Sequence, residues 1–302
     1  IASKFTEYNT ELVDINNLRT KKTELQFTKM QSCGNDYIYF EDLEGKITCP
    51  ESLAINFVDR HYGIGGDGIV LIEKSDVADA KMRIFNKDGS EGQIAGNAIR
   101  CVAKYLYEKG IVRKETMTIE SLSGVKEVKV YSFGGVVTSA SADLGKAELR
   151  GENIPSVWKG DTVVNQPMEL DGKTYHVTLV NLGNPHCVIF CDKVDDVPVS
   201  TLGPRIENSE YFPAKTNVEF IRVVNESTVK MRVWERGNGE TWACGTGAAA
   251  AAVACVLNGL CKADTDITVK LKGGDLIVRY ASDGSVTLTG NVEKIYEGTV
   301  EF

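Results

Sequence analysis

The sequence lacks any hydrophobic run long enough to span a membrane. The longest, residues 248 to 257, ends at Asn258-Gly259, whereas a transmembrane helix needs about 20 apolar residues. An excess of positive charge is also lacking, since 34 lysines and arginines against 42 acidic residues give a net charge of -8 and a pI near 5.1. These absences predict that neither a membrane nor a nucleic acid is the main partner.

Metal and nucleotide motifs are missing as well. The three histidines lie far apart and no Cys-x-x-Cys pair occurs, which argues against a zinc site. Residues 62 to 68 are rich in glycine, but this loop contains no Gly-Lys-Ser/Thr, and no GxGxxG lies between a strand and a helix. The eight cysteines are irregularly spaced and no secretion signal opens the sequence. We therefore expect reduced thiols and a cytoplasmic location.

The most informative feature that is present is a duplication. Residues 81 to 110 read KMRIFNKDGSEGQIAGNAIRCVAKYLYEKG, and residues 230 to 259 read KMRVWERGNGETWACGTGAAAAAVACVLNG. An offset of 149 aligns the two copies without a gap, and upstream it places Gly34-Asn35 on Gly183-Asn184. A repeat of this length predicts two related domains.

Each copy reads as a strand, a polar loop and a helix that begins near Gly96 or Gly245. A helix start offers unpaired N–H groups and the positive end of the macrodipole, which suits a carboxylate. The same position lowers the pKa of a cysteine, so we expect Cys244 to be a thiolate near neutral pH. Its counterpart in the first copy is Ala95.

Outside the repeat, alternating patterns predict further elements. We expect a helix over residues 50–61, and strands over 26–40 with an interruption at 33–36, 69–73, 116–121, 125–132, 135–144, 175–181, 276–280 and 285–289. Cys33 is expected to pack as a small apolar residue.

Five segments resemble the diaminopimelate epimerase family of cofactor-independent amino-acid racemases: CGNDYIYF, DGSEGQIAGNAIRC, LGNPHCV, ERGNGETWACGTG and LKGGDLIV. The matches extend from about Phe27 to Gly298. The resemblance implies an α+β fold of two pseudo-symmetric domains, each a mostly antiparallel, barrel-like sheet around a central helix. We expect a tail over 1–25, a first domain over 26–145 joined by 289–302, and a second domain over 146–288.

By the same resemblance, the chain interconverts LL- and meso-diaminopimelate in lysine and cell-wall precursor biosynthesis. Two opposed cysteines would transfer protons at Cα, without a cofactor or a metal. Cys244 is one of them, and Ala95 stands where the family has the other. Arg236 would bind the distal carboxylate in a bidentate fashion, and His186 would orient the site. The residues implied to bind substrate are Asn35, Asn86, Gly96, Asn97, Asn184, Asn217, Glu235, Arg236, Gly245 and Thr246.

Ala95 limits what the chain can do, because alanine cannot move a proton. We expect little full epimerisation. The intact Cys244 and binding residues favour a deliberate replacement of a cysteine, but natural loss stays open. The alternatives are a histidine or proline racemase of the same fold and a non-catalytic amino-acid-binding relative. The sequence does not fix the oligomeric state and allows a homodimer.

Overall fold

A computed structural model describes residues 23–92 and 95–302 of the chain. The expected tail over 1–25 lies outside the described residues as far as residue 22, and residues 24 and 25 belong to the first strand. The helices of the described part are α1 (Pro50–Phe57), α2 (Gly96–Glu108), α3 (Val199–Glu207) and α4 (Gly245–Leu257).

The strands of the described part are mostly antiparallel and form one continuous hydrogen-bonded network. In the first half they are β1 (Glu24–Ser32), β2 (Asn35–Glu41), β3 (Gly68–Glu73), β4 (Ala80–Asn86), β5 (Glu91–Gly92), β6 (Thr116–Ser121), β7 (Gly124–Phe133) and β8 (Val136–Lys146). In the second they are β9 (Gln166–Leu170), β10 (Lys173–Asn181), β11 (Pro185–Phe190), β12 (Asn217–Asn225), β13 (Thr228–Glu235), β14 (Gly239–Thr241), β15 (Asp266–Leu271), β16 (Gly274–Tyr280), β17 (Ser285–Asn291) and β18 (Glu293–Glu301).

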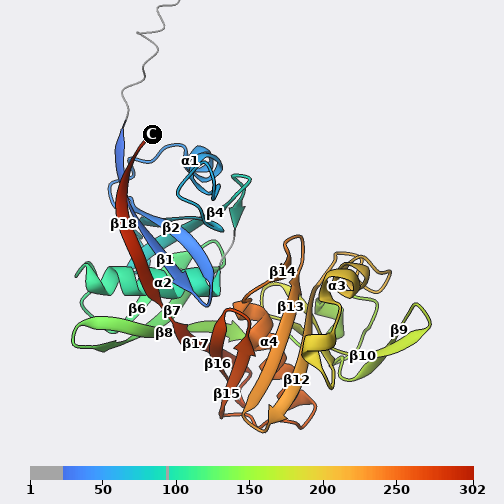
Figure 1. Cartoon of the computed structure of the whole chain (residues 1–302). Helices are drawn as coiled ribbons and strands as arrows, with labels where there is room; N and C mark the ends of the chain where they lie inside the picture. Colours follow the sequence, from blue (N-terminus) through green and yellow to red (C-terminus); the bar gives the residue numbers. More distant parts are fainter. Residues whose placement is uncertain (1–22, 93–94) are drawn as a thin grey trace, which may run out of the picture.

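The elements gather into two lobes (Figure 1), and each lobe surrounds one buried helix. Helix α2 packs against β1, β7 and β8, and helix α4 packs against β10, β12 and β16. Alanine is the commonest residue of α4, and these small side chains let the strands approach closely on all sides of the helix. The α+β fold with a helix at the centre of each half is confirmed.

The strand pairing repeats with the sequence. In the first half β2 and β3 run parallel with Tyr37 opposite Gly68, and in the second β11 and β12 run parallel with His186 opposite Asn217. Both positions differ by the offset of 149 that aligns the two copies. The duplication is therefore visible in the register of the sheet as well as in the sequence.

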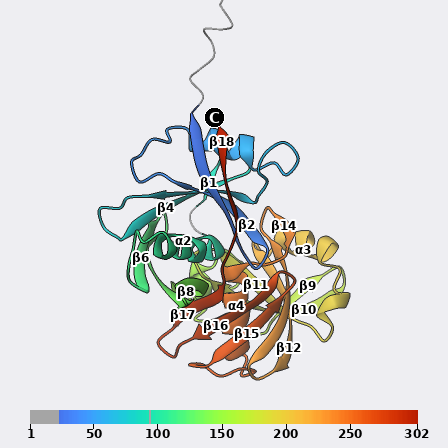
Figure 2. The same cartoon turned by 60° about the vertical axis from the view of Figure 1, so that its left-hand side comes forward.

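The end of the chain returns to the first half. Strand β18 runs antiparallel to β1, and Figures 1 and 2 show the two strands side by side. Strand β17 pairs with β8 and so joins the two halves of the network. Strand β18 was not predicted from the sequence, because its side chains are nearly all exposed and give no alternating hydrophobic signal.

Two helices differ from expectation. Helix α1 ends at Phe57 and not near residue 61, because the Asp59 carboxylate accepts hydrogen bonds from the backbone N–H groups of His61 and Tyr62 and holds a turn there. Helix α3 was not predicted, since it contains Gly203 and Pro204, both poor helix formers. The glycine is needed because a Cβ there would lie 2.5 Å from the Trp234 ring.

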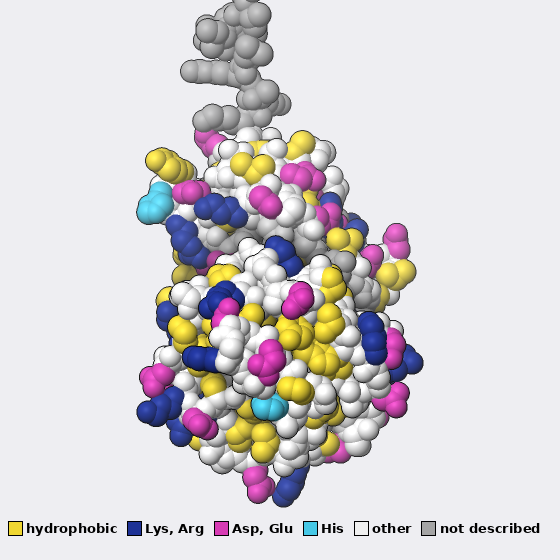
Figure 3. All heavy atoms as spheres, turned by 90° about the vertical axis from the view of Figure 1, so that its right-hand side faces the viewer, with side chains coloured by type: hydrophobic (Ala, Val, Ile, Leu, Met, Phe, Trp, Pro, Cys, Tyr) yellow, Lys and Arg dark blue, Asp and Glu magenta, His cyan; other side chains and the backbone are white. Residues whose placement is uncertain are grey.

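The surface carries charges of both signs. Figure 3 shows acidic, basic and hydrophobic side chains interspersed over the face that bears α3, β9 and β10. Of the helices in residues 23–92 and 95–302, none has both the length and the hydrophobicity that crossing a membrane requires.

Candidate functional site

The two helix starts of the repeat meet at the centre of the molecule. Ala95 and Cys244 precede α2 and α4 with nearly the same extended backbone, φ -128° and ψ 119° against φ -120° and ψ 115°. A Cβ added to Gly245 would lie 3.9 Å from the Cα of Gly96 and 2.9 Å from Leu288. Glycine at both starts therefore lets the two N-termini approach, and it brings two sets of unpaired N–H groups together.

On the first side, asparagine side chains connect the β1–β2 turn to α2. Asn97 Nδ2 donates to Asn35 Oδ1 at 3.3 Å, and Asn35 Nδ2 donates to Asp67 Oδ2 at 2.8 Å. Asn97 is buried and Asn35 is partly exposed. The chain of amides fixes the orientation of both side chains beside Gly96.

The second side repeats this contact with related residues. Asn184 Nδ2 lies 3.3 Å from Thr246 Oγ1, and these positions are Asn35 and Asn97 plus 149. Here the network continues inward, because His186 Nε2 lies 3.0 Å from Asn184 Oδ1 and His186 Nδ1 lies 2.7 Å from Glu219 Oε1. His186 and Glu219 are fully buried. The contacts fit the orienting role implied for His186.

The expectation that Cys244 is a thiolate near neutral pH is wrong. Its thiol accepts a hydrogen bond from Gly247 N at 3.3 Å and lies 3.6 Å from Thr246 Oγ1, contacts that favour the anion. Burial and the nearby Glu235 and Glu219 carboxylates outweigh them and raise the pKa of the Cys244 thiol well above its usual value. Cys244 is therefore protonated at pH 7.

The remaining candidates line the turn after β13. Glu235 accepts a hydrogen bond from Thr241 Oγ1, and burial raises the pKa of its carboxyl. Asn217 Oδ1 accepts from the N–H of Arg236 at 2.9 Å, and Asn217 Nδ2 donates to Pro185 O at 2.8 Å. The amide thus ties β11 to the turn, and the Arg236 side chain is exposed.

Asn86 belongs to a different hydrogen-bonded turn from the other candidates. It is exposed at the end of β4, and its Nδ2 donates to Ser90 Oγ at 3.0 Å. Cys33 is buried within the core cluster of the second half, which confirms its packing. Among the described residues no group of three or more His, Cys, Asp or Glu side chains could hold a metal ion. All eight cysteines lie in the described part, and all are free.

Several residues beside the candidates were missed. Asp67 and Glu219 hold candidate side chains directly, Arg100 donates to Asn97 Oδ1 at 2.8 Å, and the exposed Trp242 packs against Gly34. One signal was available for Glu219, which is a lone acid within the apolar strand segment VEFI. Nothing local in the sequence marks the other three.

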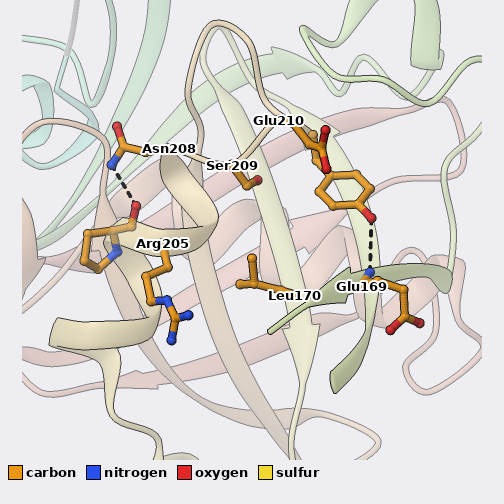
Figure 4. A pocket seen from close by; sticks show the side chains of 8 residues that line it. Glu169, Leu170, Arg205, Asn208, Ser209 and Glu210 are labelled. Carbon is orange, nitrogen blue, oxygen red and sulfur yellow. Dashed lines mark hydrogen bonds between the residues drawn. The ribbon is translucent and has the colours of Figure 1, made fainter. Parts of the chain in front are cut away.

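A separate hollow lies away from these residues. It has a volume of about 540 Å³ and lies between the end of α3 and the β9–β10 hairpin (Figure 4). Tyr211 accepts a hydrogen bond from the Glu169 N–H at 3.2 Å across it. Its lining includes none of the candidate residues: Glu169, Leu170, Pro204, Arg205, Asn208, Ser209, Glu210 and Tyr211.

Comparison with known proteins gives strong matches over nearly the whole chain. The family model described as diaminopimelate epimerase matches residues 27–149 and 178–295. A diaminopimelate epimerase from Desulfovibrio desulfuricans is 46% identical over 281 residues, 91% of this chain and 97% of that protein. One from Geobacillus sp. is 47% identical over 280 residues, covering 91% of this chain and 98% of that protein.

Solved structures of more distant proteins share the fold. A probable proline racemase from Agrobacterium radiobacter superposes with a TM-score of 0.67 at 13% identity, over 91% of this chain and 92% of that chain. A PhzF-family phenazine biosynthesis protein from Bacillus anthracis gives a TM-score of 0.66 at 15% identity, over 92% and 99%. At such identities the likeness concerns the fold alone.

Proposed function

The chain belongs to the diaminopimelate epimerase family, and from this premise we propose that it is an isomerase acting on diaminopimelate. Its reaction is the interconversion of the LL and meso forms by proton transfer at Cα. The observation that carries the proposal is the meeting of two equivalent helix starts at Gly96 and Gly245. A substrate carboxylate held by N–H groups from both starts would present Cα between positions 95 and 244.

The chemistry needs one group on each face of Cα. A base removes the proton from one face and an acid returns a proton to the other, so no net proton is consumed. Cys244 is the thiol on the α4 side. With Ala95 on the α2 side the second group is absent, and we expect this chain to bind substrate but to epimerise it poorly.

Asn35, Asn97, Asn184 and Thr246 are proposed to border the substrate. Their support is the pair of equivalent amide contacts beside the helix starts. Glu235 and Arg236 are proposed to bind the rest of the substrate. Arg236 Nη1 donates to Ala214 O at 3.3 Å, and the other N–H groups of this exposed side chain are proposed to bind the distal carboxylate. Asn86 and Asn217 keep the substrate-binding role that the resemblance implies.

The first test restores the missing group. Ala95→Cys should raise the rate of interconversion by about 10²–10⁴-fold, the usual contribution of one positioned acid or base. The assay follows LL- to meso-diaminopimelate conversion by chiral chromatography, and thiol alkylation should abolish the gain. Cys33→Ala in the same background is the control, because Cys33 packs in the core. A variant that binds diaminopimelate without interconverting it would make this chain a binding protein.

The second test concerns the substrate. Isothermal titration of the Ala95 protein should show binding of LL- or meso-diaminopimelate, because the binding residues are intact. Proline and histidine serve as competitors, since they lack the distal carboxylate. Tighter binding of either would favour a racemase of another specificity.

A further inference from the structure

Beneath the start of α2 lies a buried cation, the guanidinium of Arg100. Arg100 is fully buried, and its Nη2 donates to Ser32 Oγ at 2.7 Å and to Asn97 Oδ1 at 2.8 Å. Its Nη1 donates to Gly96 O at 3.1 Å, whereas Nε has no hydrogen-bond partner among the described residues. Among the described residues no carboxylate forms an ion pair with it. A cation at a helix N-terminus is unfavourable, and a buried charge needs a compensating charge. An anion bound on this side of the site would therefore be stabilised.

Beneath the start of α4 the buried ionisable side chain is a carboxyl, that of Glu219. Glu219 Oε1 would lie 2.8 Å from a Cβ added to Gly247, and that Cβ would lie 3.2 Å from Cys244 Sγ. The carboxyl therefore lies against the first turn of α4, close to the thiol. Its other oxygen, Oε2, is buried and accepts no hydrogen bond from residues 23–92 or 95–302.

The partner of Glu219 does not supply a spare positive charge. Asn184 Oδ1 accepts from His186 Nε2 at 3.0 Å, so the 2.7 Å contact between His186 Nδ1 and Glu219 Oε1 holds a single proton. Whichever atom carries that proton, the pair has no net charge. The start of α4 thus lacks the uncompensated cation that lies beneath the start of α2.

The difference breaks the symmetry of the duplication. The offset of 149 places an uncharged residue opposite each of these side chains: Ala249 opposite Arg100, Val70 opposite Glu219 and Tyr37 opposite His186. The two helix starts have matching backbones, but an arginine without an ion pair in the described part of the chain lies behind α2, whereas the His186–Glu219 pair behind α4 has no net charge.

We propose that Arg100 and Glu219 are positioning residues that make the two helix starts unequal, so that the α2 side takes up an anion while Cys244 on the α4 side keeps its proton. The inference rests on the proposed function. A thiol at position 95 would then be the resting base and Cys244 the resting acid. After one turnover the two would have exchanged protonation states, and the resting form would be regained by processing the opposite isomer or by proton exchange with water.

The other titratable groups around both sites leave this contrast in place. The titratable groups that face Arg100 are Cys33 of the β1–β2 turn, Tyr39 of β2 and Cys101 of its own helix. None of these side chains carries a negative charge at pH 7. Around Cys244, Glu235 adds a second carboxyl on the same side as Glu219. The anion-favouring and proton-favouring surroundings therefore lie on opposite helix starts.

The test measures both thiols in one protein. The Ala95→Cys protein is labelled with iodoacetamide without substrate at a series of pH values, and peptide mass spectrometry gives the labelling rate of each cysteine. The midpoint of a cysteine is the pH at which its labelling rate reaches half of its maximum. The thiol introduced at position 95 should have a midpoint about one pH unit or more below that of Cys244, because only the thiolate reacts. Equal midpoints, or the reverse order, would overturn the proposal.

Matched variants of the Ala95→Cys protein test whether Arg100 and Glu219 cause the difference between the two midpoints. Arg100→Met should raise the midpoint of the introduced thiol and leave that of Cys244 unchanged, and Arg100→Lys should keep it low. Lys104→Met is the control, since Lys104 is a buried cation on the same helix with an acidic partner, Glu108, at 2.7 Å. Glu219→Gln should lower the midpoint of Cys244, whereas Glu207→Gln, at another buried carboxyl of the second half, should not.

The outcomes separate this proposal from the proposed function. If Arg100→Met fails to fold, the order of the two midpoints in Ala95→Cys still tests the proposal, because Ala95→Cys alters neither Arg100 nor Glu219. Equal shifts from Arg100→Met and Lys104→Met would overturn the role of Arg100. Unequal midpoints without any interconversion of diaminopimelate would support the charge asymmetry and overturn the epimerase assignment.

Discussion

At the scale of single residues, the surroundings of Cys244 outweigh its position on α4. A helix start lowers the pKa of a thiol, yet Cys244 is buried beside two carboxyl groups and its pKa is raised. The helix start follows from local sequence. The burial of Cys244 and its proximity to Glu219 of β12 and Glu235 of β13 arise from the tertiary structure. The sequence around residue 244 therefore does not predict them.

Slow alkylation of Cys244 is the first prediction at this scale. At pH 7, iodoacetamide should label the exposed Cys49 before Cys244, because a protonated thiol is a poor nucleophile. Labelling of Cys244 should accelerate as the pH rises. Peptide mass spectrometry of timed samples gives both rates, and denatured protein, in which the two should react alike, is the control. Rapid labelling of Cys244 in native protein at pH 7 would contradict the raised pKa.

Arg236 provides the second prediction. Arg236→Ala should weaken binding of diaminopimelate by about 10- to 100-fold, since a hydrogen bond to a charged group contributes about 1.5–3 kcal/mol. Binding of alanine, which has no distal carboxylate, should change little. Titration calorimetry measures both, and Arg205→Ala, at an exposed arginine paired with Asp171, is the control. If the two ligands lose affinity equally, Arg236 does not bind the distal carboxylate.

At the scale of elements, the helices and strands that were predicted correctly are those whose hydrophobic pattern reflects a buried face. The apolar run after Gly245 predicted α4, and the alternation around residues 82 and 231 predicted β4 and β13. It failed for α3, whose helix is maintained by packing of Gly203 against Trp234 despite poor local propensity. It also failed for β18, which is held by pairing with β1 and not by a buried face.

An ion cluster that joins three segments gives a stability prediction. Asp36 of β2 binds Lys29 of β1 at 2.6 Å and Arg60 of the α1–β3 loop at 2.5 Å. Burial alone would raise the pKa of Asp36, but the hydrogen bonds from Arg60 and Lys29 outweigh it and lower the pKa. Asp36→Asn leaves the buried Lys29 without its acid, so the free energy of unfolding should fall by about 3–5 kcal/mol.

The pH dependence follows from the sign of that shift. A carboxyl whose pKa is lower in the folded state stabilises the fold above its unfolded pKa of about 3.9, and the stabilisation is lost as the pH falls through the folded pKa. Urea unfolding from pH 7 to pH 3 should therefore show a steeper acid loss for the parent than for Asp36→Asn. Asp266→Asn, at an exposed pair with Arg279, should change stability by less than about 0.5 kcal/mol. Parallel curves for parent and Asp36→Asn would contradict the assignment.

At the scale of the whole molecule, the two halves meet through close backbone contacts as well as through paired strands. A Cβ added to Gly273 would lie 1.9 Å from Cys33 O, so the β15–β16 turn of the second half packs directly on the β1–β2 turn of the first. Trp242 covers the same junction, with Lys272 Nζ 5.2 Å from its ring centre. The domain boundaries expected at residues 145 and 288 stay a prediction, which the separate core clusters support.

Gly273→Ala should therefore force the two turns apart. We expect a loss of about 1–3 kcal/mol in the free energy of unfolding, the usual result of adding a methyl group to a packed site. Diaminopimelate should also bind more weakly, since Asn35 follows the displaced turn. Lys272→Ala is the control, because it shortens a side chain of the same turn without adding bulk. Urea unfolding and calorimetry measure the two effects, and unchanged values for Gly273→Ala would show that the turns separate without cost.

The pairing of β18 with β1 has a consequence for synthesis. Among the described strands β1 emerges from the ribosome first and β18 last, so the sheet of the first half stays incomplete until β18 has been made. The second half has all its own strands before β18 emerges, and domains generally fold as units during translation. The half that is made first is therefore the half that finishes folding last, and until β18 emerges the edge of β1 stays open to chaperones and to other nascent chains.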